Sequence, residues 1–177
     1  MITRHSSRRG SLATLLPELL EDATRYDRIA GYFNSSVLEI AGESLERMPA
    51  GSKARIIANS DLDLLDVTSA QQAARAITQS WRAGQPEDVT PATQARLRRL
   101  SKFLSEGRIE VRVLPDEVFG LVHGKAGVVY RRDGSKVAFM GSTNESKRAW
   151  TLNYEIVWVD ESPEGIGWVP PRPRPCG

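Results

Sequence analysis

The chain has 177 residues, of which 40% are hydrophobic and 26% are charged, with a net charge of +2. These values predict one soluble folded core, and they exclude the disordered, collagenous and disulfide-stapled classes of protein. A single cysteine, no signal-like N-terminus and no apolar run near the roughly 18 to 20 residues of a bilayer span predict a cytoplasmic protein with no membrane partner.

The first part of the chain alternates helical and strand patterns. Leucines at helical spacing after Ser11 predict an amphipathic helix that runs to about Ala23, in which Pro17 marks either a kink or the true start. The pattern then predicts a strand, a helix and a second strand, over residues 26–33, 37–48 and 53–59. This order is typical of the start of a βαβ unit.

The rest of the chain changes from helices to strands. Helices are expected over residues 68–81 and 91–105. Strands are expected over residues 109–114, 122–131, 137–140 and 154–159, with Asp133-Gly134 as a hairpin turn. The fold class is therefore α/β, with a mixed sheet flanked by helices. We expect one domain over residues 1–162 and a flexible Pro- and Arg-rich tail over residues 163–177, in which residues 170–175 are extended.

Polar residues of the kind that bind phosphate recur in this strand-rich part. His123 and Lys125 are two apart on the strand expected over residues 122–131, so both side chains are expected on one face. Ser142 and Asn144 follow the next strand, which returns from the hairpin toward the same pocket. Taken singly, serine and asparagine here are also ordinary turn formers, and a lone histidine is more often structural. The four together favour a site.

A third segment contains Asn153 and Glu155, again two apart and expected on one side of a strand. Each of the patterns H-x-K, G-S-x-N and N-x-E is weak alone, but their order across one hairpin is specific. In this order the chain resembles the phospholipase D superfamily. Residues 29–33, followed by the helix from Val37, also resemble the opening of phospholipase D-like modules that are fused to helicases or belong to restriction endonucleases.

The resemblance implies a phospholipase D-like half-domain that hydrolyses phosphodiesters without a metal or cofactor. In the family, a histidine attacks phosphorus and forms a covalent phosphohistidine, which assigns this role to His123. Lys125 and Asn144, with Ser142 beside them, are then expected to neutralise the charge that develops on the phosphate oxygens. Glu155 is expected to hydrogen-bond the far nitrogen of His123 and fix its tautomer.

The family mechanism uses two histidines, whereas this chain has one H-x-K. The only other histidine, His5, matches no second copy of the motif. Single-copy members of the superfamily pair about a two-fold axis, so the resemblance implies a homodimer in which His123 from both chains completes the site. DNA is the expected substrate, and a helicase is a possible partner.

One position departs from the family pattern: Tyr130 stands five residues after Lys125, where the family usually has aspartate. The alternative function is therefore a catalytically degenerate module that binds DNA or associates with a helicase. A lipid-hydrolysing enzyme ranks last, because the motif is single and no interfacial apolar segment is visible.

Overall fold

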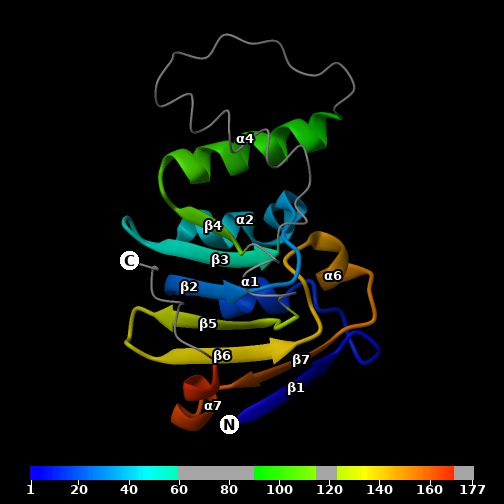
Figure 1. The fold of residues 1–177 in the computed structure, drawn as a ribbon, viewed down its shortest axis with the longest axis vertical. Coiled ribbons are helices and arrows are strands. Elements are labelled where there is room, and N and C mark those ends of the chain that lie inside the picture. The colour runs from blue at the N-terminus through cyan, green and yellow to red at the C-terminus, as the bar shows by residue number, and fades with distance from the viewer. Residues whose placement is uncertain (60–89, 115–122, 170–177) are drawn as a thin grey trace.

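A mixed β-sheet runs through the centre of the molecule. The computed structural model describes residues 1–59, 90–114 and 123–169, and over these residues seven strands join in the order β1-β7-β6-β5-β2-β3-β4 (Figure 1). Strands β2, β3 and β4 are parallel, and the other neighbouring pairs are antiparallel. The strands are β1 (Ile2–Ser6), β2 (Ala23–Ile29), β3 (Lys53–Asn59), β4 (Ile109–Leu114), β5 (Ala126–Arg131), β6 (Lys136–Gly141) and β7 (Ile156–Asp160). The expected α/β class with a mixed sheet is confirmed.

Helices cover one face of this sheet. They are α1 (Leu15–Leu19), the 3-10 turn η1 (Ser35–Val37), α2 (Leu38–Arg47), α4 (Pro91–Ser105) and α6 (Lys147–Thr151). Helices α1 and α2 lie behind the sheet in Figure 1, and α4 packs against α2 and β4. Alternate strand residues face this layer: Val157 and Val159 are buried, whereas Trp158 between them is 46% exposed. The core therefore lies between the helices and one face of the sheet.

The first helix is shorter than its leucine pattern predicts. Helix α1 spans Leu15–Leu19, and β2 already begins at Ala23. Asp22 has a φ of 56°, in the left-handed region that aspartate enters more readily than most residues. This residue turns the chain into the sheet. Leu12 and Leu20 are nevertheless buried, because the short helix and its flanking turns pack on the core together.

Elements with a strong periodic pattern form where the sequence predicts them. Helix α2 matches the helix expected over residues 37–48 to within one residue at each end, and α4, β3 and β4 have the expected bounds. Helix α4 begins where it does because Pro91 occupies its first turn and the Thr90 hydroxyl accepts a hydrogen bond from the Thr93 N–H at 3.3 Å. The helix expected over residues 68–81 lies outside the described residues.

The hairpin between β5 and β6 also forms as expected. Gly134 has a φ of 84°, and the Ser135 N–H donates to Oδ1 of Asp133 at 2.9 Å. Strand β5 begins only at Ala126, so the strand expected over residues 122–131 was too long at its N-terminal end.

Strand β1, the turn η1 and helices α6 and α7 were not predicted. Strand β1 pairs with β7 without any apolar alternation of its own, and the Arg4 guanidinium lies 5.0 Å from the ring centroid of Trp158. Helix α7 (Pro163–Trp168) forms at the start of the expected flexible tail, because Pro163 occupies its first turn and the Ser162 side chain caps it. Residues 170–177 lie outside the described part of the chain.

Candidate active site

Three polar segments meet at the edge of the sheet where β6 ends and β5 and β7 begin, on the right in Figure 1. They are residues 123–125, 141–144 and 153–155. The Gly141 N–H donates to the carbonyl oxygen of Lys125 at 3.0 Å, which joins the first segment to the second. The Ser142 N–H donates to the carbonyl oxygen of Ile156 at 3.0 Å, which joins the second segment to β7. Backbone hydrogen bonds of the antiparallel strands thus bring the motif segments together.

Glu155 is the buried centre of this edge, with 6% of its surface exposed. Its carboxylate accepts hydrogen bonds from the Ser142 hydroxyl and, at 3.2 Å, from the Asn153 side-chain amide. Its backbone N–H donates to the Ser7 hydroxyl at 2.9 Å. Glu155 and Asn153 therefore do share one side. Among the described residues no hydrogen bond joins Glu155 to His123, so the carboxylate that was expected to fix the histidine tautomer has other partners.

His123 and Lys125 have few competing bonds, whereas the side-chain oxygen of Asn144 is buried. The His123 residue is exposed, and its imidazole makes no hydrogen bond to the described residues. The Lys125 ammonium donates to the carbonyl oxygen of His123 at 3.2 Å, and Oδ1 of Asn144 has no partner within the described ranges. Because β5 begins only at Ala126, strand alternation does not place His123 and Lys125 on one face. The hydrogen bond between them joins the Lys125 ammonium to the backbone of His123 and not to its imidazole.

A buried polar cluster that the sequence did not single out lies next to residues 141–144. Arg28 and Glu145 form an ion pair with 2.9 Å between Nε and Oε2, and 0% and 2% of their side chains are exposed. The Tyr26 hydroxyl donates to Oε1 of Glu145 at 2.9 Å. Nη2 of Arg28 donates to the carbonyl oxygen of Thr143 at 2.6 Å, and Nη1 has no hydrogen-bond partner among the described residues. We refer to Tyr26, Arg28 and Glu145 as the Arg28 cluster.

The sequence contains a partial signal for the Arg28 cluster. Tyr26 and Arg28 are two apart in a predicted strand, so they share a face, and Tyr26 marks that face as the buried one. A charged side chain at such a position requires a buried partner. No local pattern indicates that Glu145, more than a hundred residues away, is this partner.

Burial raises the pKa of Tyr26 well above its ordinary value near 10; the Glu145 carboxylate adds to this rise and Arg28 opposes it. Above about pH 10 the unfolded chain therefore ionises this phenol while the folded chain keeps it protonated, and the free energy of unfolding falls as the pH rises.

We expect Tyr26→Phe to remove this dependence, so that the variant loses less stability than the native chain between about pH 9 and pH 11, by up to about 1.4 kcal/mol per pH unit. Urea unfolding at both pH values measures the difference. Equal losses in the two proteins would show that Tyr26 ionises alike in the folded and unfolded chains.

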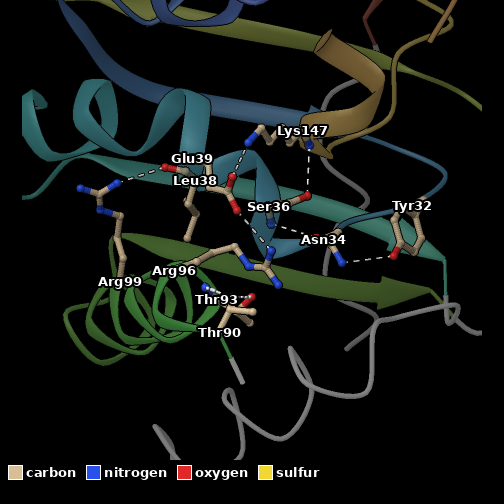
Figure 2. A network of polar contacts seen from close by, with 10 residues as sticks. All are labelled: Tyr32, Asn34, Ser36, Leu38, Glu39, Thr90, Thr93, Arg96, Arg99 and Lys147. Carbon is tan, nitrogen blue, oxygen red and sulfur yellow. Dashed lines mark hydrogen bonds and ion pairs between the residues drawn. The ribbon is translucent and has the colours of Figure 1, made fainter. Parts of the chain in front are cut away.

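Ion pairs join helix α6, which follows residues 141–144, to the helical layer, as Figure 2 shows. Nζ of Lys147, in α6, lies 2.6 Å from Oε2 of Glu39, and Nη1 of Arg96 lies 3.3 Å from Oε1 of the same carboxylate. The Lys147 N–H also donates to the Ser36 hydroxyl at 3.1 Å. The hydrogen bond from Lys147, with that from Arg96, lowers the pKa of Glu39. These contacts join α6 to α2 and α4, and they pair the charge of Lys147.

Two cavities lie away from the sheet edge that holds the motif segments. A cavity of about 630 Å³ is bordered by Glu18, Arg47 and Arg132, and a largely apolar one of about 260 Å³ lies between Trp158 and Trp168. In the described ranges, no three His, Cys, Asp or Glu side chains are grouped so that they could hold a metal ion. No helix in these ranges is both long enough and apolar enough for a membrane span.

Comparison with known proteins identifies the family of the chain. A family model described as "Cardiolipin synthase, PLD-like domain" matches residues 16–169. No curated protein matches the chain significantly.

Among solved structures, Nuc of Salmonella typhimurium, a phospholipase D family member, has a TM-score of 0.54 and 18% identity over 93% of this chain and 85% of its own. NucT of Helicobacter pylori has a TM-score of 0.55 and 16% identity over 94% and 88%. Yeast tyrosyl-DNA phosphodiesterase has a TM-score of 0.54 and 11% identity over 90% of this chain and 31% of its own. These identities support the fold alone, but the family model covers most of the chain. The chain therefore belongs to the phospholipase D superfamily.

Proposed function

We propose that the protein is a metal-independent phosphodiesterase that cleaves DNA through a covalent phosphohistidine. The observation that carries this proposal is the meeting of the three motif segments, with Gly141 bonded to Lys125 and Ser142 bonded to Glu155. Structural relatives that are named as a tyrosyl-DNA phosphodiesterase and as a phospholipase D family member support the reaction class.

In this proposal the exposed His123 imidazole attacks phosphorus, so that a P–N bond forms as the P–O bond to the leaving alcohol breaks. Lys125, whose ammonium bonds the His123 backbone, and the side-chain amide of Asn144 would then donate hydrogen bonds that neutralise the charge on the phosphate oxygens. Water then attacks phosphorus, the P–N bond breaks, and the histidine is regenerated. Glu155 acts on Ser142 and Asn153, which it holds in place, and not on the tautomer of His123.

The leaving alcohol needs a proton, and the hydrolytic water must lose one. We propose that a second copy of the chain supplies His123 for both transfers across a two-fold dimer. The exposure of His123 at the sheet edge suits such a shared site.

The departure at Tyr130 does not weaken the proposal. Tyr130 lies five residues along β5 from Lys125, roughly 16 Å at the strand rise, and pairs with Lys136 at the hairpin end. Its ring contacts the Arg25 guanidinium, with 4.5 Å from the ring centroid to Cζ. Tyr130 thus takes part in packing at the opposite end of the strand.

The native chain is expected to hydrolyse a chromogenic bis-phosphodiester and to nick plasmid DNA as fast in EDTA as in Mg²⁺. Loss of cleavage in EDTA, restored by a divalent ion, would refute the metal-free route. Inactivity under both conditions, with DNA still bound, would favour the degenerate DNA-binding module. A helicase partner is tested separately, by co-purification of a helicase with the native chain.

A further inference from the structure

The Arg28 cluster takes no part in the chemistry proposed above, yet it places two full charges in the interior. The side chains of Arg28 and Glu145 are 0% and 2% exposed. Removing two such charges from water costs about as much as their attraction returns, and apolar residues of similar volume are often equally stable. Stability alone therefore gives no reason for this pair.

The contacts of the Arg28 cluster converge on the residues around Asn144. Arg28 donates to the carbonyl oxygen of Thr143 at 2.6 Å, and Glu145 receives both Arg28 and Tyr26 on its carboxylate. The residues immediately before and after Asn144 are thus both fixed. The backbone of Glu145 is also bonded on both sides, since its N–H donates to the carbonyl oxygen of Tyr32 at 3.0 Å and its own carbonyl accepts from the N–H of Asn34 at 2.9 Å.

The packing of the neighbouring strands leaves room for the Arg28 side chain to reach residues 143–145. Arg28 faces Gly127 of β5, which in turn faces Phe139 of β6. A Cβ at Gly127 would lie 2.6 Å from the Phe139 ring, so only glycine leaves room for the ring there. Cζ of Arg28 lies 4.9 Å from the centroid of that ring, and the Tyr26 ring stacks on it at 6.2 Å. The guanidinium therefore extends from β2 past β5 to the segment after β6.

We infer that Tyr26, Arg28 and Glu145 are positioning residues, which set where Ser142 and Asn144 stand relative to the bound phosphate. The inference rests on the proposed function of that site. A misplacement of about 1 Å in a catalytic group can cost about 100-fold in rate, so a rigid buried support has a direct effect on turnover. A buried ion pair can fix the position of the backbone, because its hydrogen bonds are strong in one geometry only, whereas apolar side chains pack well in several arrangements.

The test is the double variant Arg28→Met with Glu145→Leu, which removes both charges and leaves neither unpaired. We expect it to fold with an unfolding midpoint near that of the native chain, to keep its KM, and to lose about 10-fold to 100-fold in kcat toward the bis-phosphodiester. The control is Arg108→Met, which removes a part-buried guanidinium that bonds the carbonyl oxygens of Leu45 and Met48, and it should keep kcat.

A folded double variant with native kcat would overturn the inference, because the role of the cluster would then be structural only. If the double variant does not fold, Tyr26→Phe decides the question: it keeps the ring stack and removes one bond to Glu145. We expect it to lower kcat about threefold to tenfold at unchanged KM, and an unchanged kcat would overturn the inference.

Failure of the proposed function would be visible separately, as inactivity of the native chain itself. The positioning role is then measured with vanadate, an analogue of the five-coordinate transition state at phosphorus, by calorimetric titration of the native chain and the folded variant. At least tenfold weaker binding by the variant would support the inference, whereas equal binding, or none to the native chain, would overturn it.

Discussion

Replacing His123 with alanine is expected to lower kcat for phosphodiester cleavage at least about 1,000-fold, because the variant lacks the attacking nitrogen. The chain offers a matched control, since it has two histidines and the other is His5. His5 lies in β1 opposite Val157, and its Nε2 is 3.4 Å from the Thr3 hydroxyl. We expect His5→Ala to retain native kcat.

The same variant tests whether the site is shared between two chains. If each site takes His123 from both subunits, excess His123→Ala protein should draw native subunits into mixed dimers and reduce the activity per native subunit. Cleavage is measured after the two proteins are mixed and equilibrated. Activity that depends only on the amount of native protein would contradict the shared site, and a native level of cleavage by His123→Ala alone would contradict the phosphohistidine route.

The parts of the fold that the sequence predicted are those whose pattern reports directly on burial. Helix α4 has Thr90 and Pro91 at its start and a periodic apolar face that ends in the buried Leu100 and Phe103, so both its existence and its bounds were readable. Strand β3 is an apolar run because both of its neighbours are strands and both of its faces are largely covered.

One element that was not predicted depends on contacts distant in sequence. Strand β1 has the polar residues of an edge strand, and it forms because β7 provides hydrogen-bonding partners and Trp158 packs against Arg4. Helix α1 ends early because Asp22 takes a left-handed backbone conformation, which no periodicity indicates. A sequence pattern predicts an element well only where residues close in sequence determine which side chains are buried.

The candidate site shows the same division. The order of the motifs along the chain indicated which residues gather at the sheet edge, because antiparallel neighbours must return to the same end. It did not indicate which side chains bond to one another. Glu155 bonds Ser142 and Asn153 instead of His123, and Arg28 finds its partner in Glu145 from across β5. Such choices depend on distances of a few ångströms that only the packed sheet defines.

The glycine that opens the G-S-x-N motif is required by the spacing of two strands, and Gly141→Ala is expected to destabilise the protein by about 3 kcal/mol. A Cβ at Gly141 would overlap the carbonyl oxygen of Ile156 and lie 3.0 Å from Cα of Val157, so only a backbone shift of β6 or β7 could relieve it. That shift would also separate Ser142 from Glu155, because Ser142 directly follows β6 and Glu155 directly precedes β7.

Urea unfolding of Gly141→Ala measures the loss. Gly10→Ala is the matched control, since a Cβ there meets nothing within 4 Å, and its stability should stay within about 1 kcal/mol of the native value. Native stability in Gly141→Ala would mean that the spacing of β6 and β7 is wider than the structure has it. The loss of stability should be accompanied by a loss of kcat in the fraction that remains folded, since the strand spacing that excludes a side chain at Gly141 is the one that brings Ser142 to Glu155.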